Sequence, residues 1–121
     1  MGQILLVDDD PDQLRIRELV LRSAGFSVHV ATSAESALAM MRPVPEKIGL
    51  VVTDHVLPGI TGAEMVREMR SWMCQTPVLV LSGMPGIEEE YNGLQASIQM
   101  KPMAPAELLL TVGKLLPQPS N

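Results

Sequence analysis

The feature that most constrains the fold is a short apolar run in the middle of the chain that leads to a single carboxylate. Residues 50–52, Leu-Val-Val, are apolar and mostly β-branched, which is typical of a parallel strand buried on both faces. The run leads to Asp54, and Pro58-Gly59 then forces a turn. A carboxylate where a buried parallel strand gives way to its loop lies at the mouth of an α/β sheet, where such folds bind ligands. The sequence therefore predicts a functional carboxylate at this position.

Similar apolar runs recur along the chain, with helical patterns between them. They lie at residues 3–7, 27–31, 77–81 and 97–100, and the last has the least support. Helix-start signals follow the runs, namely Asp10-Pro11, Thr32 with Glu35, Thr61 with Glu64, and Ala104-Pro105. Strands that alternate with helices predict one α/β domain over residues 1–121. Its doubly wound parallel sheet has five strands in the order 2-1-3-4-5, with helices on both faces.

The apolar residues of the first predicted helix fall on one side. Ile16, Leu19 and Val20 share that side with Ser23, and Gly25 suits the C-terminal stop. Later helices carry their apolar residues at positions 37–41, 65–69 and 108–116. Residues 117–121 are expected to form a frayed tail.

Composition narrows the classes of function. With 121 residues, 46% of them hydrophobic, the chain can build a single core. A net charge of −5 argues against nucleic acid as a direct partner, because phosphate contacts need clustered Lys and Arg. No apolar run approaches the roughly 18 residues of a membrane span, and residues 1–7 lack a signal-peptide pattern. The expected location is cytoplasmic, without membrane contact, and the lone Cys74 agrees with a reducing compartment.

Three carboxylates are expected to meet at one edge of the sheet. Asp8 and Asp9 follow the first apolar run, as Asp54 follows the third, and the C-terminal ends of neighbouring parallel strands lie side by side. Like charges about 4 Å apart repel by roughly 1 kcal/mol in water and by several times more in a partly buried site. The three carboxylates therefore need a cation, or protons, to coexist, and oxygen ligands suit Mg²⁺.

Other polar residues at the same edge complete a site for phosphoryl transfer. Ser82-Gly83 follows the fourth run and Lys101 follows the fifth. Transfer to a carboxylate needs a nucleophile, a metal and donors that take up charge on the moving group. The Ser82 hydroxyl, the Gly83 amide and the Lys101 amine are such donors, so Asp54 is interpreted as a phosphoryl acceptor. Each motif alone is an ordinary turn, cap or loop. The interpretation depends on all four following apolar runs at the same edge of one sheet.

The aspartates also fit other kinds of metal site less well. A calcium loop that starts at Asp8 requires Gly at its sixth position and Glu at its twelfth, where this chain has Gln13 and Leu19. His29 and His55 have no His-rich neighbourhood, so metal binding through histidine is not expected.

The whole chain resembles the receiver domain of two-component response regulators. The matching stretches are residues 4–11 (Ile-Leu-Leu-Val-Asp-Asp-Asp-Pro), 53–62 (Thr-Asp-His-Val-Leu-Pro-Gly-Ile-Thr-Gly), 81–83 (Leu-Ser-Gly) and Lys101-Pro102. The resemblance implies a flavodoxin-like fold and a phosphorelay function. Asp54 would receive a phosphoryl group from a phosphohistidine on a histidine kinase or a histidine phosphotransfer domain. The domain would catalyse only its own phosphorylation and dephosphorylation, and a weak homodimer is compatible with the family.

The resemblance also implies roles for the other site residues. Asp9, Asp54 and the Val56 carbonyl would hold Mg²⁺, with Asp8 helping through water. Ser82 and Lys101 would contact the phosphoryl oxygens and couple phosphorylation to a change at the surface.

Two features depart from the usual receiver pattern. Ile98 stands three positions before the lysine, where receivers often carry an aromatic switch residue. The segment between Ser82 and Lys101 is short, and only residues 88–91 and a few neighbours suit a helix, so the fourth helix is expected to be short or irregular. This short segment is similar to receivers at the C-terminus of hybrid sensor histidine kinases.

Two alternative functions remain open at this point. One is an aspartyl-phosphate phosphatase of the haloacid-dehalogenase kind, in which Asp8 and Asp10 form the nucleophile pair and Asp8 is modified. The other is a receiver-like interaction module that is not phosphorylated, which Ile98 and the irregular fourth helix suggest.

Overall fold

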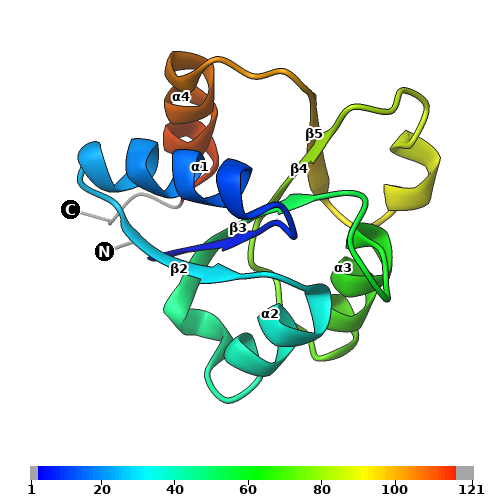
Figure 1. Ribbon diagram of the computed structural model, residues 1–121. Helices are drawn as coiled ribbons and strands as arrows, with labels where there is room; N and C mark the ends of the chain where they lie inside the picture. The colour runs from blue at the N-terminus through cyan, green and yellow to red at the C-terminus, as the bar shows by residue number, and fades with distance from the viewer. Residues whose placement is uncertain (1–2, 117–121) are drawn as a thin grey trace.

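The computed structural model describes residues 3–116, and its centre is a five-stranded sheet between two layers of helices (Figure 1). The strands are β1 (Gln3–Val7), β2 (Ser27–Ala31), β3 (Ile48–Asp54), β4 (Val78–Ser82) and β5 (Ala96–Met100). All neighbouring strands pair in parallel, in the order β2-β1-β3-β4-β5. The predicted flavodoxin-like topology is confirmed, including the weakly supported fifth strand.

Residues 3–116 also contain four α-helices and two short 3₁₀ segments; all of them lie between strands except the last helix, which follows β5. They are α1 (Pro11–Ser23), α2 (Ala34–Met41), η1 (Pro45–Lys47), α3 (Gly62–Ser71), η2 (Glu88–Tyr91) and α4 (Pro105–Leu115). Helices α1 and α4 cover one face of the sheet, and α2 and α3 cover the other (Figure 1). None of the helices within residues 3–116 has the combined length and apolar character that a membrane crossing requires.

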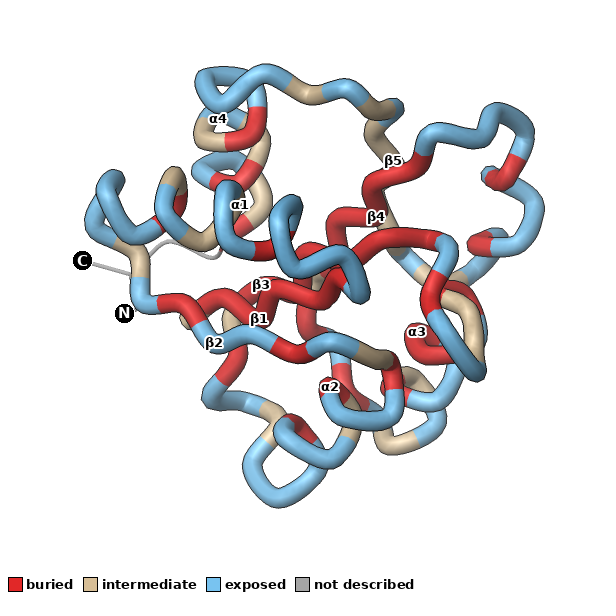
Figure 2. Tube along the Cα trace, viewed as in Figure 1, coloured by how far each residue is buried: buried red, intermediate tan, exposed pale blue. Residues whose placement is uncertain are grey.

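The inner strands are buried because both of their faces are covered (Figure 2). Side chains alternate along a strand, so Leu5 and Val7 of β1 pack toward α2 and α3, while Ile4 and Leu6 pack toward α1 and α4. This arrangement explains why the strands appear in the sequence as continuous apolar runs rather than as an alternating pattern.

The buried side of α1 differs from the prediction. Ile16 and Leu19 are 54% and 56% exposed, whereas Leu14 and Leu21 are buried against the sheet. Leu14 and Leu21 are seven residues apart, or about two turns, so they form a stripe on one side of the helix. Arg17 lies between them on the same stripe. The prediction was wrong for Ile16 and Leu19 but not for Val20, which packs partly buried against the same core cluster as Leu14 and Leu21. The contact with the sheet, and not the number of apolar residues on a side, selects the buried side.

The predicted helix caps are correct at two helices and displaced at a third. Asp10 caps α1, and Thr61 with Glu64 forms the full capping box of α3. At α2 the cap is Ser33, whose hydroxyl accepts a hydrogen bond from the Ser36 amide, so the predicted Thr32 box is wrong. The later start places Ala34, Ala37 and Met41 in the core.

The segment between β4 and β5 contains only the short η2, as predicted. Its buried residues Ile87 and Tyr91 anchor it to the core, and Arg67 of α3 donates a hydrogen bond to the Glu90 carbonyl. Ile98, at the position where receivers often carry an aromatic residue, is partly buried against the same core cluster. The tail predicted for residues 117–121 lies outside the described residues.

Candidate functional site

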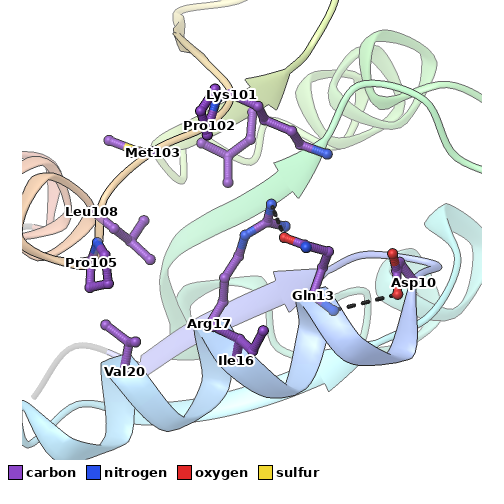
Figure 3. A pocket seen from close by; sticks show the side chains of 11 residues that line it. Asp10, Gln13, Ile16, Arg17, Val20, Lys101, Pro102, Met103, Pro105 and Leu108 are labelled. Atoms are coloured by element: carbon purple, nitrogen blue, oxygen red, sulfur yellow. Dashed lines mark hydrogen bonds between the residues drawn. The ribbon is translucent and has the colours of Figure 1, made fainter.

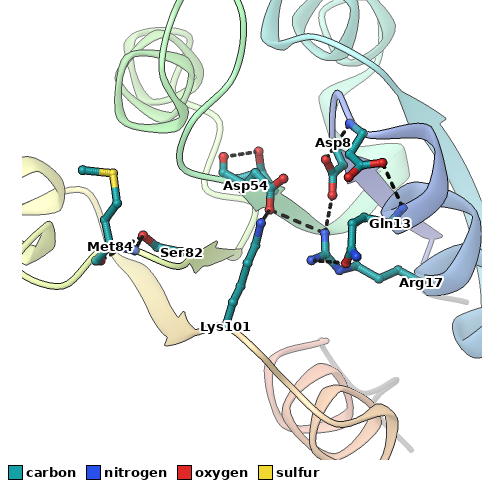
Figure 4. A network of polar contacts seen from close by, with 9 residues as sticks. Asp8, Gln13, Arg17, Asp54, Ser82, Met84 and Lys101 are labelled. Carbon is teal, nitrogen blue, oxygen red and sulfur yellow. Dashed lines mark hydrogen bonds and ion pairs between the residues drawn. The ribbon is translucent and has the colours of Figure 1, made fainter.

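The polar residues predicted to converge lie at the C-terminal edge of the sheet (Figure 4). Asp8 directly follows β1, Asp54 is the last residue of β3, and Lys101 directly follows β5. The parallel register aligns Val7 of β1 with Thr53 of β3, so Asp8 and Asp54 leave the sheet side by side. The topology alone therefore brings together residues separated by more than forty positions.

The three carboxylates form a compact cluster. Asp8, Asp9 and Asp54 each offer an oxygen, and these oxygens lie within 4.8 Å of one another. Asp8 and Asp54 are buried, and Asp9 is exposed. Carboxylate oxygens are the ligands that Mg²⁺ and Ca²⁺ prefer, and an exposed third member leaves an open side for water or a phosphate oxygen. The residues present fit a hard divalent cation.

Two side-chain cations already neutralise part of this cluster. The Lys101 amine lies 2.8 Å from Asp54 Oδ1, and Arg17 of α1 places Nη1 2.5 Å from Asp8 Oδ2. The same Arg17 nitrogen lies 3.5 Å from Asp54 Oδ1. Figure 4 shows both basic side chains reaching toward Asp54. Within the described residues the site thus holds three carboxylates against two cations.

The environment of Asp54 disfavours its charge when no metal is bound. Burial is the main cause and raises the pKa of Asp54 to about 6, from an ordinary 3.8. The neighbouring Asp8 also raises this pKa, whereas the Lys101 amine lowers it. Asp54 is therefore mostly ionised at neutral pH, which a nucleophile needs, at a cost in folding free energy.

Ser82 and Gly83 lie at the end of the neighbouring strand β4. The Ser82 hydroxyl donates to the Met84 carbonyl at 3.0 Å and accepts from the Met84 amide at 2.9 Å. Gly83 is exposed, and a Cβ added there would have open space around it. Val56, whose carbonyl is the predicted metal ligand, follows Asp54 in an exposed loop. The roles of these three residues stay predictions.

Sequence reasoning missed two features of the site. Arg17 belongs to it, and the available signal was a charged residue midway along the Leu14–Leu21 stripe. His55, for which the sequence indicated no role beyond the loop, is buried and bonds through Nδ1 to the Tyr91 hydroxyl at 2.8 Å. This hydrogen bond links the loop directly after Asp54 to η2. A sequence pattern could not show a contact between positions so far apart in the chain.

Comparison with known proteins identifies the family. Residues 4–112 match the model of the response regulator receiver domain. The chain belongs to this family. A receiver domain takes part in signalling through aspartate phosphorylation and works with a two-component kinase; it is not a conventional enzyme.

Individual relatives agree with this assignment. The receiver domain is 34% identical over 92 residues to proteins named cell cycle response regulator CtrA from Brucella abortus and Brucella suis. The match covers 76% of this chain and 39% of those proteins, so the chain spans about two fifths of their length.

Solved structures extend the likeness to nearly the whole chain. The chemotaxis response regulator CheY4 of Vibrio cholerae is 29% identical with a TM-score of 0.85, covering 96% of this chain and 99% of that one. The receiver domain of the hybrid histidine kinase CckA is 27% identical with a TM-score of 0.82, covering 96% and 100%. Because both kinds of receiver are similar, an origin in a hybrid kinase stays a prediction.

The phosphatase alternative does not survive these observations. It required Asp8 and Asp10 as a nucleophile pair, with Asp8 as the modified residue. Asp8 is instead fully buried and paired with Arg17, and Asp10 caps α1 by accepting hydrogen bonds from the Asp12 and Gln13 amides. The receiver family assignment replaces it.

Proposed function

We propose that Asp54 accepts a phosphoryl group from a phosphohistidine, with Mg²⁺ held by Asp9, Asp54 and the Val56 carbonyl and assisted by Asp8 through water. The observation that carries this proposal is the buried Asp54 carboxylate, which lies among oxygen ligands on one side and against the Lys101 amine on the other. A nucleophile, metal ligands and a fixed positive charge thus meet at one point, as phosphoryl transfer requires.

The transfer itself needs little from the protein beyond position and charge. An Asp54 oxygen attacks the phosphorus and the P–N bond breaks. The imidazole leaves with the bonding electron pair and takes up a proton. The product is an acyl phosphate on Asp54. Water later attacks the same phosphorus, the P–O bond to Asp54 breaks, and the carboxylate is restored as inorganic phosphate leaves. Magnesium, when bound, supplies positive charge to the phosphoryl oxygens.

Lys101, Ser82 and Gly83 are proposed to stabilise the transferred group. Lys101 already contacts Asp54 at 2.8 Å and can pair with a phosphoryl oxygen. The Ser82 hydroxyl has to leave Met84 to donate to the phosphoryl group, and the Gly83 amide adds a backbone donor. Loss of the Ser82–Met84 pair would alter the loop that leads to η2. This change in the loop offers a route for the signal that needs no rotating aromatic ring at position 98, where this chain has Ile98.

The wider role follows the same proposal. Residues 1–121 act as one phosphoacceptor domain in the cytoplasm. A histidine kinase or a histidine phosphotransfer domain supplies the phosphoryl group, and phosphorylation changes which partners bind, with a weak homodimer as one such state.

Intact-mass measurement after incubation with acetyl phosphate and MgCl₂ tests the proposal. We expect one added phosphoryl group that maps to Asp54, that is lost in chelator and that is absent in Asp54→Asn. The matched control is Asp12→Asn, because Asp12 is an exposed aspartate in the first turn of α1 and its variant should label normally. Undiminished labelling of Asp54→Asn would refute the assignment. No labelling with any divalent metal would favour the interaction module.

A further inference from the structure

An arginine on the first helix contacts the carboxylates that are proposed to bind the metal. The Arg17 nitrogen Nη1 bonds to Asp8 Oδ2 and lies 3.5 Å from Asp54 Oδ1. Its other terminal nitrogen, Nη2, donates to the Gln13 side-chain oxygen at 3.3 Å. One guanidinium thus contacts two of the three carboxylates and is held in place from its own helix.

The placement of Arg17 is not that of an ordinary surface residue. Its side chain is only 11% exposed, and it lies on the buried stripe between Leu14 and Leu21. A guanidinium removed from water loses its hydration and must regain it from fixed partners. Asp8, which is fully buried, has the same requirement. Each group therefore compensates for the burial of the other.

We propose that Arg17 is a tethered cation that competes with the divalent metal for Asp8 and Asp54, so that metal loading requires its displacement. This inference rests on the proposed metal site. The guanidinium occupies lone pairs of Asp8 and Asp54 that the metal ion or its bound water would use, and the like charges of the two cations repel at close range. The positive charge that stabilises the metal-free cluster is then the charge that magnesium must replace.

The structure provides a place for the displaced side chain. A hollow of about 530 Å³ runs beside α1, and Arg17 itself lines it (Figure 3). Asp10 and Gln13 line the same hollow and offer oxygen acceptors, while Val20 and Leu108 offer apolar contact for the aliphatic stem. Gln13 already bonds Arg17. A change of side-chain torsions can therefore move the guanidinium off Asp8 while α1 stays in place.

The functional consequence is a receiver whose phosphorylation requires a higher magnesium concentration than its metal ligands alone would require. Lys101 pairs with Asp54 and leaves Asp8 to Arg17, so the two cations do not replace each other. Removing Arg17 removes the competitor while every proposed metal ligand stays present. Since a charge-assisted hydrogen bond to a buried group must be broken for metal to bind, the expected gain in magnesium affinity is roughly tenfold or more.

Magnesium titration by calorimetry, on unphosphorylated protein, compares Arg17→Met with the matched control Arg15→Met. Arg15 lies two residues away on α1 and is exposed, so its variant makes the same change of net charge away from the cluster. We expect Arg17→Met to bind Mg²⁺ about tenfold more tightly than the control. Arg17→Lys keeps the charge but loses the forked geometry and should fall between them. Equal affinities, or weaker binding by Arg17→Met, would overturn the inference.

A second measurement uses the unmodified protein and does not depend on how the variants fold. The side-chain NMR signal of Arg17 should shift on adding MgCl₂, and the signal of Arg15 should not. An unchanged Arg17 signal at saturating magnesium would refute displacement.

The proposed metal site and the proposed displacement of Arg17 fail in different ways. If the Arg15→Met control binds no magnesium, the proposed metal site is wrong and the inference falls with it; if both variants bind equally, only the inference is wrong.

Discussion

Replacing Asp54 by asparagine measures how much the metal-free pocket disfavours a charge at this position. Asp54 is 5% exposed, and its pKa is raised to about 6 from an ordinary 3.8. One pKa unit corresponds to about 1.4 kcal/mol, so a rise of about two units corresponds to about 3 kcal/mol. Asparagine has nearly the same shape and no charge. In chelator at pH 7.5 the variant should therefore be more stable than the wild type by an amount of this order.

The pH dependence of the stability difference tests whether the gain in Asp54→Asn comes from removing the Asp54 charge. Because the folded pKa lies above the unfolded value, the stability that Asp54 contributes is complete below about pH 3.8. It is lost as the pH rises through about 6. The advantage of Asp54→Asn should therefore be near zero at pH 4 and should grow until about pH 7. Other carboxylates titrate in both proteins, and their effects cancel to first order in the difference.

Thermal and urea unfolding in chelator between pH 4 and 7.5 provide the assay. A gain of about 3 kcal/mol corresponds to a rise in Tm of roughly 10 °C for a chain of this size. Asp12→Asn is the control, because it removes the same charge from an exposed position on α1. A variant less stable than the wild type at pH 7.5, or a gain that persists unchanged at pH 4, would refute the reasoning. In excess Mg²⁺ the wild type should become more stable than Asp54→Asn, because the metal binds and stabilises the protein that keeps the carboxylate.

Three further variants test individual contacts. Asp9→Asn should weaken Mg²⁺ binding about tenfold in calorimetry, because it removes one anionic ligand; unchanged affinity would exclude Asp9 as a ligand. Thr61→Ala should destabilise the fold by about 1 kcal/mol in urea unfolding, since it breaks the capping box with Glu64. Gly62→Ala should cost about 1–3 kcal/mol in the same assay, because a Cβ there would lie 2.7 Å from the Tyr91 hydroxyl. Full stability would show that the loop adapts.

The strands and the polar residues at their C-terminal ends were the most predictable part of the molecule. Apolar runs followed by Asp8, Asp54 and Lys101 specify both the sheet and the edge at which these residues meet, because parallel strands place their C-terminal ends together. The capping signals of α1 and α3 were equally local. The Ser33 cap of α2 was missed because Thr32 and Ser33 are both good caps, and only the packing of α2 chooses between them.

Contacts made through space were not predictable in the same way. Ile16 and Leu19 form the more apolar side of α1 in the sequence, yet the sheet packs against the stripe that contains Leu14 and Arg17. Ser82 follows its strand as expected, but the loop turns its hydroxyl onto Met84.

The amino-acid sequence by itself determined the order of strands, the carboxylate cluster and the lysine, because these depend on hydrophobic period, local turn chemistry and the geometry of parallel sheets. The tertiary structure alone decided that Arg17 faces Asp8 and that His55 bonds Tyr91, residues 9 and 36 positions apart. The rotation of a helix about its axis and the path of a loop depend on packing between elements. A charged side chain such as Arg17 can therefore belong to a site that the sequence around it does not predict.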